Sequence, residues 1–124
     1  MTDEGYITTL CGSVRLGKDI WDAVAQDFTL SGHIVLTVNV WGQYDHLHSE
    51  EGQKTKELLD RIHKKKIELS DQVIILKKDD YIGESTRSEL EHAMNLGKPV
   101  GFIDVDHWVP ASILCADLRR DKVD

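Results

Sequence analysis

The segment Gly83 to Glu89 combines hydroxyl groups, a guanidinium and carboxylates at the start of a predicted helix. It follows the apolar stretch Gln72 to Lys77, which predicts a buried strand. Ser85 is a candidate N-cap, and Thr86 adds a hydroxyl in the first helical turn. Glu89 then lies one turn inside the helix, at the carboxyl end of the strand, where a carboxylate is well placed for chemistry.

Glu89 has two interpretations from the residues alone. At the border of the buried helix face it loses solvent, which raises the pKa of a carboxyl, while the helix dipole lowers that pKa. A carboxylate in this setting suits chemistry on a bound ligand. It equally suits a structural role, as a first-turn partner of the helix dipole or in a pair with Arg87 or His92.

A second candidate segment, Gly12 to Gly17, lies between the first predicted strand and a helix. Gly12 and Ser13 offer backbone amides and a hydroxyl, and Arg15 adds a guanidinium. Amides before a helix N-terminus favour an anion such as phosphate. The spacing matches neither a P-loop nor a dinucleotide fingerprint, so the alternative is an ordinary turn with a surface arginine.

Hydrophobic periodicity indicates that strands and helices alternate along the chain. The predicted elements are strands at Tyr6–Cys11, His33–Val40 (covered on both faces), Gln72–Lys77 and Pro99–Asp104, and helices from Lys18, over Lys54–Ser70, over Ser85–Leu96 and over Ala111–Leu118. This order predicts an α/β fold with a three-layer, doubly wound, mostly parallel sheet of four or five strands, the fifth near the C-terminus. Ligands would bind at the carboxyl ends of these strands.

The length of 124 residues predicts a single domain over residues 1–124. Fifteen basic and 22 acidic residues give a net charge of −7, which argues against binding to nucleic acid or to anionic membranes. No apolar run approaches the roughly 20 residues of a membrane span. The acidic start Met1 to Glu4 is unlike a signal peptide, so we expect a cytoplasmic protein.

The cysteines and histidines lack the spacing of a known metal motif. Cys11 and Cys115 are far apart, and we expect both to be small buried apolar residues. His46 and His48 alternate in a polar stretch that offers no further ligands at motif spacing. We therefore predict no metal and no cofactor. The lysine run Lys64 to Lys66 is interpreted as a solvated helix face.

Several of these segments together resemble a known family. They are Cys11 to Arg15, the strand after Asp71, Gly83 to Glu89 continuing through Glu91-His92-Ala93, and Gly97 to Val100. Over about Tyr6 to Phe102 the chain resembles the nucleoside 2-deoxyribosyltransferase-like superfamily, which includes the 2′-deoxynucleoside 5′-monophosphate N-glycosidases. The resemblance implies a small-molecule nucleoside or nucleotide as substrate and a homodimer or higher homo-oligomer.

The resemblance also implies roles for individual residues. Glu89 would be the nucleophile that forms a covalent glycosyl-enzyme, and Gly83 would lie beside the substrate. Three residues of the first loop, Gly12, Ser13 and Arg15, would face a 5′-phosphate, with help from Ser85 or Thr86. The family's aspartate on the preceding helix falls at His63, and the nearest acids are Asp60 and Glu68.

The departure at His63 leaves two alternatives. Either His63, with Asp60 on the same helix face, serves as acid, base or sugar contact, or the site is incomplete and the chain is a noncatalytic nucleotide-binding module. Aromatic residues are candidates for stacking on the base or for packing: Tyr6, Trp41, Tyr44 and Tyr81. Another apolar group, Trp108, Val109 and Ile113, is expected either in the oligomer interface or in the core.

Overall fold

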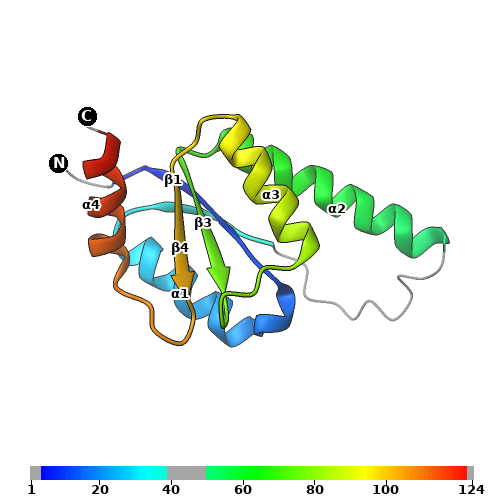
Figure 1. Cartoon of the computed structure of the whole chain (residues 1–124), viewed down its shortest axis with the longest axis horizontal. Helices are drawn as coiled ribbons and strands as arrows, with labels where there is room; N and C mark the ends of the chain where they lie inside the picture. Colours follow the sequence, from blue (N-terminus) through cyan, green and yellow to red (C-terminus); the bar gives the residue numbers. More distant parts are fainter. Residues whose placement is uncertain (1–3, 39–49, 123–124) are drawn as a thin grey trace.

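The computed structural model describes residues 4–38 and 50–122 of the chain, and within them strands alternate with helices around one sheet (Figure 1). The elements are β1 (Ile7–Cys11), the short 3-10 helix η1 (Val14–Leu16), α1 (Lys18–Leu30), β2 (Ile34–Leu36), α2 (Glu50–Leu69), β3 (Gln72–Lys77), α3 (Glu84–Asn95), β4 (Val100–Asp104) and α4 (Ala111–Lys122). The predicted α/β fold with a parallel sheet is confirmed.

The order of strands in the sheet is β2-β1-β3-β4, and every neighbouring pair is parallel. The two central strands pair through Leu10 and Ile74. From β1 the chain crosses through α1 to β2, and it then returns through α2 to β3 on the other side of β1. The direction of winding therefore reverses between β1 and β3, which is where open α/β sheets bind ligands.

Helices cover both faces of the sheet, with α1 and α4 on one face and α2 and α3 on the other (Figure 1). Leu10 packs into the core under α1 and α4, together with Trp21 and Phe28. The next residue, Cys11, belongs to the other core, with Ile67 of α2. Because side chains alternate along a strand, β1 ends with its cysteine turned toward α2 and α3.

Strand β2 is shorter and more exposed than predicted. We expected a strand over His33–Val40 that is covered on both faces, but β2 contains Ile34–Leu36 and lies at the edge of the sheet. Ile34 is half exposed. The abundance of β-branched residues identified the strand but could not place it, because the same residues suit an edge and a centre.

The helix predicted over Ala111–Leu118 is present and longer than expected, whereas the possible fifth strand near the C-terminus is not found among the described residues. In the described part of the chain the sheet has four strands, and α4 runs over Ala111–Lys122. The backbone amide of Ala111 donates a hydrogen bond of 2.9 Å to Asp27 Oδ2 of α1. Ala111 and Cys115 are fully buried, so α4 completes the core on the α1 side of the sheet.

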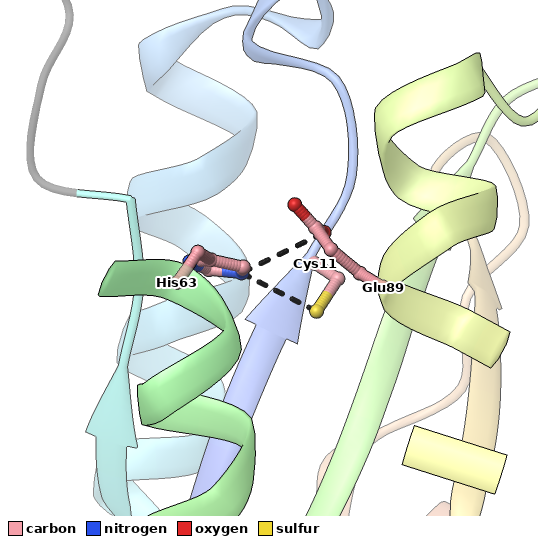
Figure 2. Close-up of side chains that lie close together, drawn as sticks. All are labelled: Cys11, His63 and Glu89. Carbon is pink, nitrogen blue, oxygen red and sulfur yellow. Dashed lines mark hydrogen bonds and ion pairs between the residues drawn. The ribbon is translucent and has the colours of Figure 1, made fainter. Parts of the chain in front are cut away.

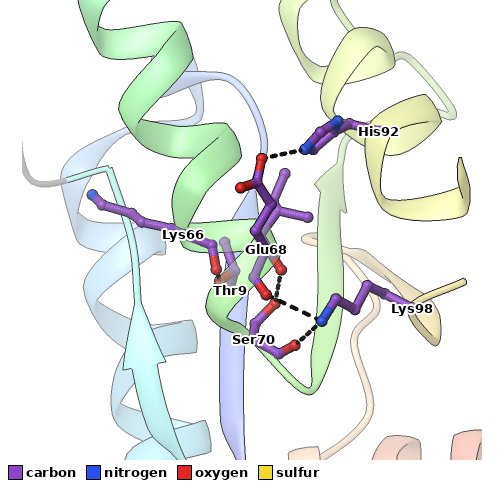
Figure 3. Close-up of polar contacts among 7 residues, drawn as sticks. Thr9, Lys66, Glu68, Ser70, His92 and Lys98 are labelled. Carbon is purple, nitrogen blue, oxygen red and sulfur yellow. Dashed lines mark hydrogen bonds and ion pairs between the residues drawn. The ribbon is translucent and has the colours of Figure 1, made fainter. Parts of the chain in front are cut away.

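Polar contacts fasten the end of α2 to α3 and to the turn after it (Figure 3). Lys98 Nζ donates to the backbone oxygens of Ser70, at 2.8 Å, and Glu68, at 3.2 Å. These carbonyls at the helix C-terminus have no partner within the helix. His92 Nε2 lies 3.0 Å from Glu68 Oε2, so His92 pairs with α2 rather than with Glu89 on its own helix. The two helices are thereby held side by side.

None of the described helices has both the length and the apolar character needed to span a membrane.

Candidate active site

A cavity of about 680 Å³ lies at the carboxyl ends of β1 and β3, at the reversal point of the sheet. Four parts of the described chain line it: the loop after β1, Val38 after β2, the inward side of α2, and the loop before α3 together with the first turns of that helix. Small-ligand pockets commonly have volumes of about 300–1,000 Å³. The cavity is therefore large enough for a nucleoside-sized molecule.

The loop after β1 is held by close contacts at Gly12 and Ser13. A Cβ on Gly12 would lie 3.0 Å from the Leu76 carbonyl oxygen and 3.3 Å from the Trp21 ring, so only glycine fits there. Ser13 Oγ accepts a hydrogen bond of 3.1 Å from the Arg15 amide. The Ser13 carbonyl accepts one of 3.0 Å from Trp21 Nε1. These contacts fix a tight loop that carries Arg15 at the cavity wall.

The N-terminus of α3 forms another part of the wall. Gly83, in an extended conformation, is the N-cap, and no side chain caps the helix. The prediction of Ser85 as N-cap is therefore wrong, because the helix begins one residue earlier, at Glu84. Ser85 is exposed and Thr86 is buried, and both line the cavity.

Three buried side chains from three different elements meet beside the cavity, and two of them, His63 and Glu89, line it (Figure 2). Cys11 ends β1, His63 lies in the middle of α2, and Glu89 lies in the second turn of α3. His63 Nε2 is 3.3 Å from Cys11 Sγ and 3.7 Å from Glu89 Oε2. Glu89 Oε2 is fully buried and has no hydrogen-bond partner. A buried carboxylate oxygen without a partner is costly for a fold and typical of a functional site.

Burial sets the ionisation of this cluster. It raises the pKa of Glu89 to about 7, although the neighbouring Cys11 thiol acts in the opposite direction. It lowers the pKa of His63 to about 4, and the charge of Lys66 lowers that pKa further. Burial, with the adjacent Glu89 carboxylate, also raises the pKa of the Cys11 thiol. At neutral pH the cluster therefore holds a neutral imidazole beside a carboxyl near its titration midpoint.

Helix α2 turns several polar side chains toward the cavity. Asp60 lines it and accepts a hydrogen bond of 3.2 Å from Lys56 Nζ. Lys66 also lines it and donates a 2.6 Å hydrogen bond to the Thr37 carbonyl. Burial lowers the pKa of Lys66. The interpretation of Lys64 to Lys66 as a purely solvated face is therefore wrong for Lys66.

A tight turn before α3 carries Tyr81 to the cavity wall. Asp79 and Asp80 have positive φ angles of 53° and 61°. The Tyr81 amide donates to the Lys78 carbonyl at 2.9 Å and closes the turn. Tyr81 itself is largely exposed, so its ring is available to a bound ligand.

Comparison with known proteins bears on the fold. No protein-family model matches this chain, and none of the curated proteins does. Among solved structures, a match is the 2-deoxyribosyltransferase of the psychrotolerant bacterium Bacillus psychrosaccharolyticus, described as a biocatalyst for the synthesis of antiviral and antitumoral nucleosides. The match has a TM-score of 0.61 and covers 87% of this chain and 79% of that chain. The two proteins share a fold. Their sequences are 19% identical, a level at which the likeness extends to the fold alone.

The structure brings nine of the ten predicted site residues to one cavity. They are Gly12, Ser13, Arg15, Asp60, His63, Gly83, Ser85, Thr86 and Glu89. The tenth, Tyr44, lies outside the described residues, as does Trp41. Tyr6 stands at the other end of β1, where its ring packs edge-on against His33. The roles of these residues stay predictions.

Sequence reasoning missed Cys11 and Lys66 as site residues. Periodicity could have predicted the face of its element on which each of them lies. Helical spacing places Lys56, Leu59, Asp60, His63 and Lys66 on one face of α2, the face that lines the cavity. Strand alternation places Cys11 on the face of β1 opposite to Leu10.

Proposed function

We propose that this chain breaks the N-glycosidic bond of a nucleoside or a nucleoside 5′-monophosphate, with Glu89 as the nucleophile. The observation that carries the proposal is the buried carboxylate of Glu89, whose Oε2 makes no hydrogen bond, at a nucleoside-sized cavity shared with the Gly12–Arg15 loop. The resemblance of the sequence to the deoxyribosyltransferase-like superfamily and the fold shared with a 2-deoxyribosyltransferase support it.

The chemistry requires a carboxylate close to the anomeric carbon. As the bond between that carbon and the base nitrogen breaks, the base leaves with the electron pair and the sugar gains positive charge. The Glu89 carboxylate stabilises this charge and bonds to the anomeric carbon, which gives a glycosyl-enzyme. Water then releases the sugar in a hydrolase, whereas the nitrogen of a second base does so in a transferase.

His63 and Asp60 have different roles in this proposal. His63 touches the nucleophile itself, and its lowered pKa makes it neutral at pH 7. We therefore assign it to positioning Glu89 rather than to protonating the leaving base. Asp60 lines the cavity and is half-buried, so it can accept a hydrogen bond from a sugar hydroxyl or from the base.

A 5′-phosphate would bind between the first loop and the start of α3. Gly12 and Ser13 offer amides and a hydroxyl, and Arg15 offers a charge. Another part of the cavity wall is the first turn of α3, which offers backbone amides that no side chain caps. Helix N-termini of this kind favour anions.

A noncatalytic nucleotide-binding module is the second candidate. Two observations favour it. His63 stands where the resembled family has an aspartate, and the nearby Asp60 is engaged by Lys56. In this case the cavity binds the nucleotide and no bond is broken.

The test is incubation of the protein with deoxynucleosides and their 5′-monophosphates, followed by chromatography for free base. We expect base release, and we expect Glu89→Ala to lower kcat/KM by roughly 10³-fold or more. Glu91→Ala is the matched control, since Glu91 is exposed on the same helix. Mass spectrometry should find a sugar adduct on the peptide that contains Glu89.

Two results separate the alternatives. Base release that persists in Glu89→Ala would overturn the nucleophile assignment. A thermal shift with nucleotides in the absence of any base release would instead support the binding module.

A further inference from the structure

The Cys11, His63 and Glu89 side chains form a group of a kind that holds metal ions. In the described part of the chain, this is the group whose thiol, imidazole and carboxylate ligand atoms all lie within 4.8 Å of one another. We propose that these three side chains bind a divalent transition metal ion of the Zn²⁺ class. The proposal goes beyond the proposed function, because metal binding depends on these three side chains alone and does not require the protein to catalyse a reaction.

The distances suit a tetrahedral ion. With Zn–S near about 2.3 Å and Zn–N near about 2.0–2.1 Å, tetrahedral geometry separates sulfur and nitrogen ligands by about 3.5 Å. The same geometry places nitrogen and carboxylate oxygen ligands about 3.4 Å apart. Here Cys11 Sγ is 3.3 Å and Glu89 Oε2 is 3.7 Å from His63 Nε2. Side-chain shifts of a few tenths of an ångström, as an order of magnitude, would complete the geometry.

The chemical types also suit this class of ion. Thiolate and imidazole ligands select Zn²⁺ and related metals over Mg²⁺ and Ca²⁺, which prefer oxygen. On binding, the Cys11 thiol proton and the proton of any protonated Glu89 carboxyl leave to solvent, and the thiolate and the Glu89 carboxylate together balance the two positive charges. Glu89 Oε2, which has no hydrogen-bond partner, gains a ligand bond. A neutral, fully bonded site is the kind that burial tolerates.

Burial and backbone position make the group unlike a surface cluster. Cys11 is fully buried, and His63 and Glu89 are 6% and 9% exposed. Each comes from a different element, so the group is held by the packing of the sheet and two helices. His63 and Glu89 line the cavity, which leaves a fourth ligand position for water or a small molecule, as in zinc sites with three protein ligands.

A bound metal would inhibit the proposed reaction. It would occupy the carboxylate that the nucleophilic attack requires. If Glu89 is the nucleophile, Zn²⁺ therefore blocks base release and a chelator restores it.

Cobalt(II) is the probe for the test, because its spectrum reports both geometry and sulfur ligation. The reduced, chelator-treated protein is titrated with Co²⁺. We expect one ion per chain, tetrahedral d–d bands in the visible, and a thiolate-to-cobalt charge-transfer band in the near ultraviolet. Addition of Zn²⁺ should abolish these bands by displacing the cobalt.

Two cysteine variants identify the ligand. Cys11→Ser should abolish the charge-transfer band. Cys115→Ser is the matched control and should leave the band unchanged, because Cys115 is equally buried but lies on the other face of the sheet beside Gln72. His63→Gln and Glu89→Gln should each weaken Co²⁺ binding by about tenfold or more.

Several outcomes would overturn the proposal: native folded protein without a charge-transfer band at saturating Co²⁺, visible bands without sulfur ligation, or a band that is lost in Cys115→Ser. Circular dichroism checks that each variant is folded. If Cys11→Ser does not fold, a charge-transfer band in both the native protein and Cys115→Ser still identifies Cys11 as the sulfur ligand. No substrate is present, so a failure here leaves the base-release test standing, and a failure of that test leaves the cobalt spectrum unchanged.

Discussion

Folding raises the pKa of Glu89 and lowers the pKa of His63. The two shifts make the free energy of unfolding depend on pH with opposite signs. Burial raises the pKa of Glu89 to about 7, so between its ordinary 4.5 and 7 the folded state binds more protons than the unfolded state. Stability from this group therefore falls as pH rises through that range. Burial lowers the pKa of His63 from 6.5 to about 4, so its contribution falls as pH decreases from 6.5 to 4.

The prediction is that single substitutions expose the two opposing slopes. In the native protein they nearly cancel between pH 4.5 and 6.5, because folding leaves the number of bound protons unchanged. Glu89→Gln should make the free energy of unfolding rise with pH, and His63→Gln should make it fall, each by up to about 3 kcal/mol. Urea unfolding at several pH values, with a chelator present, measures this. Parallel slopes in all three proteins would contradict the assignment.

Arg15 makes a separate prediction about phosphate. If its guanidinium faces a 5′-phosphate, Arg15→Ala should raise KM or Kd for monophosphates by about tenfold or more, the worth of a hydrogen bond to a charged group. The values for nucleosides should change little. Arg87→Ala is the control, since Arg87 is exposed on α3 and does not line the cavity. Equal weakening of both substrate classes by Arg15→Ala would discredit the phosphate site.

At the scale of elements, the turn between β3 and α3 holds strain next to the cavity. Asp79 has a φ of 53°, which costs an L-residue about 1–2 kcal/mol and glycine little. Asp79→Gly should therefore raise the free energy of unfolding by about 0.5–1 kcal/mol. Asp79→Val should lower it by a similar amount or more, because a β-branched residue tolerates this conformation least. Thermal or urea unfolding compares the two, and equal stabilities would show that the turn relaxes.

Helix α2 presents polar side chains to the cavity and apolar side chains to solvent. Its inward face carries Asp60, His63 and Lys66 to the cavity. Beside it, Leu58, Ile62 and Leu69 are 48%, 42% and 69% exposed and form an apolar stripe along the helix, with Ile62 at the border, where it also lines the cavity. An exposed apolar stripe on an otherwise polar helix is typical of a contact surface.

At the scale of the whole molecule, the oligomeric state stays a prediction. We expect light scattering to give about twice the chain mass of 14.1 kDa, with the α2 stripe in the interface. Leu58→Glu should then yield monomer. Ile113→Glu tests the interface expected from the sequence near the C-terminus, where Val109 and Ile113 are also about half exposed. Dissociation by Ile113→Glu alone would move the interface to α4.

The sequence by itself determined the order of elements, the parallel α/β fold and the two loops that line the cavity. These follow from local periodicity and from the rule that carboxyl ends of parallel strands share one edge. The single-domain organisation and the role of Glu89 as nucleophile stay predictions. Helix ends and the edge position of β2 escaped prediction, because tertiary neighbours decide them.

Only the tertiary structure decided which buried side chains meet beside the cavity. Cys11, His63 and Glu89 are separated by dozens of residues, and their contact depends on the face toward which β1 ends, the rotation of α2 and the distance between α2 and α3. Sequence spacing cannot predict the strand face, the helix rotation or the interhelical distance, because core packing over the whole fold sets them. For that reason the sequence indicated no metal ligand at Cys11, where we propose one.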